Sequence, residues 1–188
     1  RGVGENVFLI DEAHNLPERA RDIFSATISR RDIASVRVYT ALDAPTDRAL
    51  AALDEALVKA GELCEENMRV LEGADGAVRT GFYFNREPLP DIDSAFEAVY
   101  EKTELFYVTH KTDAEAAGAV ASFLRLSRKW RDANEAFDEK YRTYIERVDD
   151  EVTVKLFCLD PSTRLDEALG GVVEDCVNSI GVDINTAS

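Results

Sequence analysis

Two adjacent carboxylates followed closely by a histidine form the most chemically suggestive group in the sequence. Asp11, Glu12 and His14 come directly after the apolar residues 7–10. Four apolar residues with a β-branched residue at each end predict a short buried strand that ends at the carboxylates. Nucleotide-hydrolysing α/β proteins present their metal-binding acid from the end of such a strand. The pattern therefore indicates nucleotide-hydrolysis chemistry.

The residues that follow the carboxylates allow a second interpretation. Asn15 is a candidate helix N-cap, and Leu16 and Pro17 suit the first turn of a helix. Acidic pairs beside a helix N-terminus often act only as caps and as partners of the helix dipole. The capping role therefore remains the alternative to nucleotide chemistry.

Two separated segments resemble one helicase family. Residues 9–16, Leu-Ile-Asp-Glu-Ala-His-Asn-Leu, resemble motif II, the Walker B box, of DEAH-type superfamily 2 DNA helicases of the Rad3/XPD/DinG branch. Residues 154–162, Val-Lys-Leu-Phe-Cys-Leu-Asp-Pro-Ser, resemble the strand and turn with which that branch re-enters its first motor domain, before motif III. The two segments are about 140 residues apart, which is where this branch carries its mostly helical Arch domain.

The resemblance implies a role for each residue of the box. Asp11 would hold Mg²⁺ through water, and Glu12 would orient and activate the attacking water. His14 would couple the nucleotide site to the rest of the motor. The implied protein is an ATP-dependent DNA helicase of the DNA-repair type, with ATP and Mg²⁺ as cofactors. Its Arch domain would guide single-stranded DNA past the motor, and the rest of the helicase chain would be its partner.

The family pattern is incomplete at both ends of these 188 residues. The P-loop G-x-x-x-x-G-K-[ST], which precedes motif II in the family, does not occur. Without its lysine and amide cradle, Asp11 and Glu12 have no nucleotide to act on, so we expect an inactive fragment. Residues 172–188 instead resemble a segment of Tex-type transcription accessory proteins, which indicates either a chimeric gene fragment or a coincidental tail.

The composition of the chain limits the kinds of partner and cofactor that it can bind. The net charge of −15 argues against broad binding to a phosphate backbone, so a nucleic acid would need a local patch. No apolar run approaches the roughly 18–20 residues that span a bilayer, and no signal-peptide pattern opens the chain, which predicts no membrane partner. Cys64, Cys158 and Cys176 are too scattered to hold an iron–sulfur cluster and indicate reduced thiols in a cytoplasmic protein. The family's cluster cysteines precede motif II, so any cluster would lie upstream.

A basic group on a predicted helix is the candidate for DNA contact. Arg125, Arg128 and Lys129 share one helical face, with Trp130 turned to another side. In the family the Arch lies over the DNA path, so these cations would touch phosphates. The alternative is a solvated face paired with the acids that follow, such as Asp132.

Two further groups favour structural roles. The aromatic residues 82–84 could stack bases, but rings at this spacing are expected in the core. His110 follows an apolar run and has no partner at metal-ligand spacing, which predicts a surface or core-edge position.

Apolar periodicity predicts the elements that would position these residues. Helices are expected over residues 17–26, 29–39, 46–72, 91–106 and 112–133. Residues 78–85 predict a strand or an ordered loop. Alternation over residues 141–148 and 152–158, with Asp149 and Asp150 between them, predicts a β-hairpin.

These elements predict a mainly α fold of the α+β class. It would be a helical Arch-like insert with long antiparallel helices, plus a few short strands from the edge of a RecA-like motor domain. The expected division is residues 1–27 for the motor strand and helix, 28–148 for the insert, 149–169 for the return strand and 170–188 for the tail.

The strands that carry the two helicase-like segments raise an expectation about pairing, and an alternative function remains. The strands at residues 7–10 and 154–158 would be short of partners and keep exposed edges. The two ends would be displaced, pair with each other, or pair with another copy of the chain in a homodimer. The alternative function, from a different class, is a non-catalytic acidic helical protein-interaction module.

Overall fold

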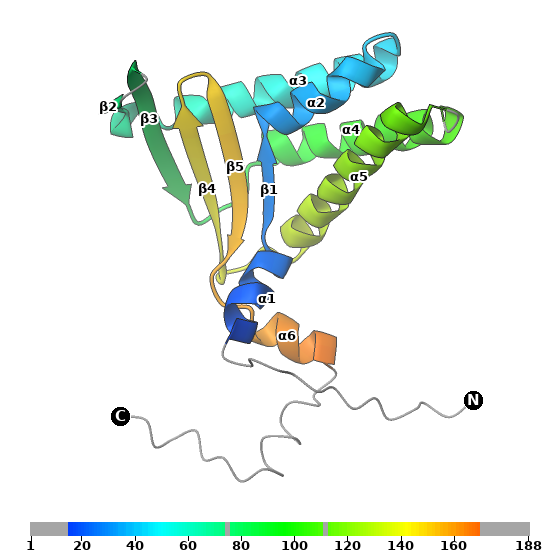
Figure 1. Ribbon diagram of the computed structural model, residues 1–188. Helices are drawn as coiled ribbons and strands as arrows, with labels where there is room; N and C mark the ends of the chain where they lie inside the picture. Colours follow the sequence, from blue (N-terminus) through cyan, green and yellow to red (C-terminus); the bar gives the residue numbers. More distant parts are fainter. Residues whose placement is uncertain (1–14, 74–75, 111–112, 170–188) are drawn as a thin grey trace, which may run out of the picture.

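The computed structural model describes residues 15–73, 76–110 and 113–169 (Figure 1). A five-stranded antiparallel sheet and a group of helices make up this part of the chain, which confirms the predicted α+β class. The elements in chain order are α1 (Leu16–Phe24), β1 (Ala26–Ser29), α2 (Arg30–Thr40), α3 (Ala44–Glu62), the short 3₁₀ helix η2 (Glu65–Asn67), β2 (Arg69–Gly73), β3 (Gly76–Asn85), α4 (Pro90–Thr109), α5 (Ala114–Glu135), β4 (Tyr141–Val148), β5 (Glu151–Cys158) and α6 (Ser162–Leu169).

The sheet has the strand order β1-β5-β4-β3-β2. The predicted hairpin of β4 and β5 is confirmed, and Asp149 in its turn takes a left-handed φ of 52°. Helices α2 to α5 gather on one side of the sheet, whereas α1 and α6 lie together beyond its lower end (Figure 1). The sheet therefore has one face packed by helices.

Local sequence signals explain where the helices begin. Ser29 and Asp32 form a capping box at the start of α2: the Ser29 hydroxyl accepts from the Asp32 N–H, and the Asp32 carboxylate accepts from the Ser29 N–H. Asp43 and Asp113 are simple N-caps: the Asp43 carboxylate accepts from the Thr46 N–H at the start of α3, and the Asp113 carboxylate accepts from the Glu115 and Ala116 N–H groups at the start of α5.

Strict alternation builds the core between sheet and helices. Every second residue of β5, from Val152 to Cys158, is buried, and the same holds for β4 from Tyr141 to Ile145. The helices add one apolar stripe each, as the 3.6-residue period predicts. The largest fully buried side chains are Trp130, Tyr141, Ile28, Ile33, Leu50, Leu53, Leu57, Ile92, Ile145, Leu156, Val36 and Val99.

The helix expected over residues 46–72 is too long by ten residues. It ends at Glu62, and Arg69–Gly73 forms β2, which pairs with β3. A Cβ on Gly61 would lie 2.6 Å from a Val152 methyl, so this position holds the end of α3 close against β5. Val70 and Leu71 fit a helical period, but pairing with β3 determines their conformation, and both remain exposed.

The expectation that the strand at residues 154–158 would be short of partners and keep an exposed edge is wrong. β5 is hydrogen-bonded to β1 on one edge and to β4 on the other, so it lies inside the sheet. Residues 26–29, which span the boundary expected after residue 27, thus pair with residues 153–156, which lie beyond the boundary expected after residue 148. The division into domains stays a prediction, and the strand expected at residues 7–10 lies outside the described residues. None of the described helices is long and apolar enough to cross a membrane.

We predict that Leu156→Ala destabilises the fold by about 2–5 kcal/mol, because the removed atoms leave a cavity between the sheet and the helices. Urea unfolding followed by circular dichroism measures this loss. Leu105→Ala is the matched control, since Leu105 is 62% exposed and should change stability by less than about 0.5 kcal/mol. Equal effects of the two substitutions would contradict the interior position of β5.

Candidate functional site

The residues of the DEAH string, Asp11, Glu12 and His14, lie outside the described part of the chain. In sequence they directly precede α1, which spans Leu16–Phe24 where the sequence predicts a helix over residues 17–26. Asn15 takes the predicted N-cap position, but its side chain makes no capping hydrogen bond. The carboxylates' own role, catalytic or capping, stays a prediction.

The structure brings together the two segments that resemble the helicase family. α1 continues directly into β1, which pairs with β5, and α1 also contacts β5 and α6. Residues close to the first segment therefore lie against residues of the second, although about 140 positions separate the two segments in the sequence. We call this region the junction, defined as residues 16–25 together with residues 156–164.

Specific hydrogen bonds fasten the junction. The Ser25 hydroxyl donates to the Arg21 carbonyl at 2.6 Å and accepts from the Cys158 N–H at 3.0 Å. Arg21 Nε donates to the Leu159 carbonyl at 3.0 Å, and the Tyr141 hydroxyl donates to the Phe24 carbonyl at 3.3 Å. Ser25 is 3% exposed, so its hydroxyl satisfies a Cys158 N–H that has no access to water.

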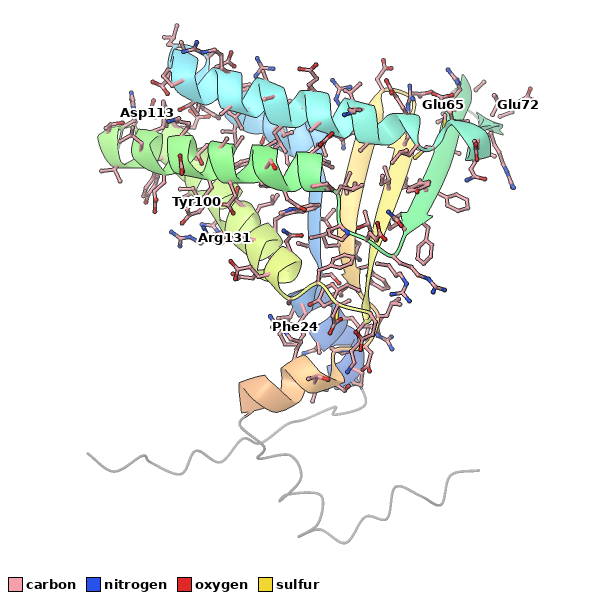
Figure 2. The ribbon with its side chains drawn as sticks, turned by 180° about the vertical axis from the view of Figure 1, so that it is seen from behind. Phe24, Glu65, Glu72, Tyr100, Asp113 and Arg131 are labelled. Atoms are coloured by element: carbon pink, nitrogen blue, oxygen red, sulfur yellow. The ribbon has the colours of Figure 1, made fainter. Side chains whose placement is uncertain are left out.

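Charged groups complete the same region. The Asp160 carboxylate accepts from the Ser162 N–H at 3.0 Å, and this bond, helped by Lys140, lowers the pKa of Asp160. The Arg164 guanidinium lies 5.7 Å from the centre of the Phe24 ring, which faces α6 at the lower end of the sheet (Figure 2). Helices α1 and α6 are thus held to each other as well as to the sheet.

The basic group predicted on α5 is exposed and lies partly beside the junction. Lys129 Nζ donates to the carbonyl of Asp22 in α1 at 2.7 Å. Arg128 Nε donates to the Tyr100 hydroxyl at 3.3 Å, and Arg125 donates to the Ser122 hydroxyl at 2.9 Å. These partners are all neutral oxygens.

The alternative for these three cations was pairing with nearby acids. Within residues 15–73, 76–110 and 113–169, none of the three forms an ion pair. Arg131 pairs instead, with Glu97 at 4.0 Å, and its guanidinium lies 4.4 Å from the Tyr100 ring centre (Figure 2). The three cations therefore make no close ion pair within the described chain. The bond to Tyr100, helped by the charge of Glu104, raises the pKa of Arg128.

Trp130 turns inward, as predicted. It is 1% exposed, stacks on Phe96 with ring centres 4.8 Å apart, and donates its indole N–H to Asp93 at 3.0 Å. Burial raises the pKa of Asp93, whereas the bond from Trp130 acts in the opposite direction. This buried pair joins α4 to α5 behind the basic face.

The core position expected for residues 82–84 is wrong for two of the three rings. Phe82 is 49% and Phe84 is 54% exposed, and only Tyr83 packs against the core. Alternation along β3 turns neighbouring residues to opposite faces, so three consecutive rings cannot share one environment. His110 is exposed at the end of α4 and stacks on Phe106, which confirms its predicted surface position.

Two cysteines lie in the described part of the chain. Cys64 and Cys158 are free and buried, and burial raises the pKa of both thiols. A raised pKa keeps a thiol protonated and a poor nucleophile near neutral pH. Neither residue is therefore a candidate for covalent chemistry.

We predict that Ser25→Ala destabilises the protein by about 1–3 kcal/mol, because the buried Cys158 N–H loses its acceptor. Hydrogen exchange with mass spectrometry should show faster exchange in residues 16–25 and around residue 158. Ser35→Ala is the control, because Ser35 is exposed and its hydroxyl only donates to a carbonyl within its own helix. Unchanged exchange at the junction would contradict the role given to Ser25.

Comparison with known proteins assigns no family to this geometry. No family model matches the sequence, and a search of curated proteins gave no match. The junction and the exposed surfaces are therefore interpreted from their own contacts.

Proposed function

We propose that this chain is part of an ATP-dependent DNA helicase and carries its DEAH box together with an Arch-like inserted domain. The observation that carries the proposal is the junction. A domain inserted into another must begin and end at neighbouring points, because its host has only one site at which to hold both connections. Here α1 and the β5–α6 segment contact each other, and each adjoins a segment that resembles the same helicase family.

The proposal assigns the chemistry to residues upstream of α1. Asp11 holds Mg²⁺ on the nucleotide, Glu12 acts as the base toward water, and His14 links the site to the rest of the motor. Carboxylate oxygens are the ligands that Mg²⁺ prefers. The P-loop that binds ATP comes from the rest of the helicase chain.

The inserted domain guides single-stranded DNA in this proposal. Arg125, Arg128 and Lys129 support this role because they make no close ion pair within the described residues and because Lys129 contacts α1. A guiding surface needs only a few local phosphate contacts, which is compatible with a net charge of −15.

One observation favours the second candidate function, a non-catalytic protein-interaction module. A largely apolar groove of about 370 Å³ lies between the end of α3 and the start of α4. Its lining includes Ala60, Leu63, Leu89 and Ile92. A groove of this kind suits an apolar anchor of a protein partner.

We predict that a chain extended upstream to include the P-loop binds ATP and hydrolyses it, and that Glu12→Gln in that chain lowers the hydrolysis rate by at least about 100-fold. ATP affinity should persist, because Asp11 and the P-loop remain. Steady-state phosphate release and nucleotide binding measure the two properties. Glu18→Gln in the exposed first turn of α1 is the control and should retain full activity. Near-normal turnover of the Glu12 variant would contradict its role as the base.

We also predict that the 188-residue chain alone shows no ATP hydrolysis above background, with or without DNA. Its sequence contains no P-loop lysine or amide cradle for the phosphates. The same phosphate-release assay applies. Turnover that is stimulated by DNA and abolished by Glu12→Gln would contradict this prediction.

A further inference from the structure

The face of the sheet opposite the helices is unusually rich in exposed rings. Alternation places the inward residues of β4 and β5 in the core. On β3 it buries Gly81 and packs Tyr83 against the core, and the other set of residues from all three strands lies on this outer face. We call it the open face. Its aromatic members are half-buried or exposed, in contrast to the buried inward residues of β4 and β5. They are Phe82, Phe84, Tyr144 and Phe157.

The rings lie on neighbouring strands and form a continuous platform. Phe84 is directly opposite Tyr144 in the register of β3 and β4. Phe82 and Tyr144 are stacked, with ring centres 6.4 Å apart and an interplanar angle of 22°. Phe82 and Phe84 are two residues apart on one strand, so their Cα atoms are about 7 Å apart. Successive flat groups of a ligand could therefore lie on successive rings.

Cations are interleaved with these rings. Lys155 is opposite Tyr144, and its ammonium group lies 4.5 Å from the centre of the Phe157 ring. Arg142 is opposite Phe157. Arg69 is opposite Thr80, at the β2 edge of the same face. The acids on this face are Glu146 and Glu151, and Glu151 accepts from the Arg31 N–H at the start of α2. The open face is thus locally cationic in a chain with a net charge of −15.

A small hollow adjoins the platform. It has a volume of about 220 Å³, and the Phe82 and Tyr144 rings form part of its wall. Arg69 supplies hydrogen-bond donors in this hollow, and Glu146 supplies acceptors. A flat group that stacks on the rings would therefore meet donors and acceptors at its edge, as a nucleobase requires.

We propose that the open face binds single-stranded DNA, with bases stacked on Phe82, Phe84 and Tyr144 and phosphates held by Arg69, Arg142 and Lys155. Exposed aromatic side chains on a sheet are a common platform for unpaired bases. The choice of DNA rests on the proposed helicase function. A protein partner fits less well, because Lys and Glu are depleted at protein interfaces, whereas Lys155 and Glu146 lie beside these rings. Duplex DNA fits less well because its bases are already stacked.

The test measures binding of a fluorescent oligothymidine of about 15 nucleotides to the 188-residue chain by anisotropy. Phe82→Ala and Phe84→Ala should each weaken binding at least fivefold, about the effect of losing one base–ring stack. Phe84→Leu should lose as much as Phe84→Ala, whereas Phe84→Tyr should bind like the unchanged chain. Leu105→Ala removes an exposed apolar group from the helical side and should have no effect. Circular dichroism verifies that each variant remains folded.

Salt dependence and strandedness give independent readouts. With the three cations of the open face on phosphates, the slope of log K against log salt should be about −2, and it should reach about −4 where Arg125, Arg128 and Lys129 hold phosphates as well. A duplex of the same length should bind at least tenfold more weakly. Equal affinity for duplex DNA, or a slope of −5 or steeper, would show phosphate binding elsewhere and overturn the proposal.

The failure of this proposal can be distinguished from the failure of the helicase assignment. One outcome is that binding survives the Phe82 and Phe84 substitutions but is lost when Arg125, Arg128 and Lys129 are changed to alanine. This outcome would place the DNA-binding site on α5 and would not contradict the helicase assignment. No binding of the oligonucleotide by the chain, or full binding by Phe84→Leu, would also overturn the open-face proposal. The helicase assignment itself depends on hydrolysis by the extended chain and its loss in Glu12→Gln.

Discussion

Pairing of β5 on both of its edges is the constraint on which the rest of the fold depends. β1 comes from the beginning of the described chain and β4 from near its end, and both are hydrogen-bonded to β5. The inward residues of β5 supply the centre of the core, where α2, α3 and α5 contact the sheet. A strand without partners could not hold these helices in place. The same pairing brings α1 beside the end of β5, so the junction is a direct consequence of sheet order.

Local signals in the sequence predicted most elements, and long-range contacts account for the errors. Ser29 with Asp32, and Asp113, mark helix starts through bonds that span three residues or fewer. The β4–β5 hairpin is likewise a contact between neighbours in sequence. In contrast, β2 competes with a continuing helix over Val70 and Leu71, and only pairing with β3 decides the outcome. The interior position of β5 depends on β1, which is more than 120 residues earlier, and no local pattern contains that information.

The candidate site also has a part that the sequence shows and a part that depends on long-range contacts. The DEAH string can be read only from its residues, because Asp11, Glu12 and His14 lie outside the described chain. The junction could not be predicted, since it needs residues 26–29 to pair with residues 153–156. The rings of β3 were recognisable as aromatic but not as exposed. Their exposure follows from the alternation of a strand that turns Gly81 and Tyr83 toward the other face, and the alternation of apolar and polar types is weak over residues 82–84.

Because successive residues of a β-strand face opposite sides, β5 uses one set of residues for core packing and the other set for surface chemistry. Val152, Val154 and Leu156 face the helices, so their shape is constrained by close packing. Lys155 and Phe157 face outward, where a change of side chain alters surface chemistry and leaves no cavity behind. Stability and recognition can therefore vary independently along one strand. This separation explains how a chain with a strongly negative net charge keeps a locally cationic, aromatic face: the outward positions are free of the packing that fixes the inward ones, and acids elsewhere set the total charge.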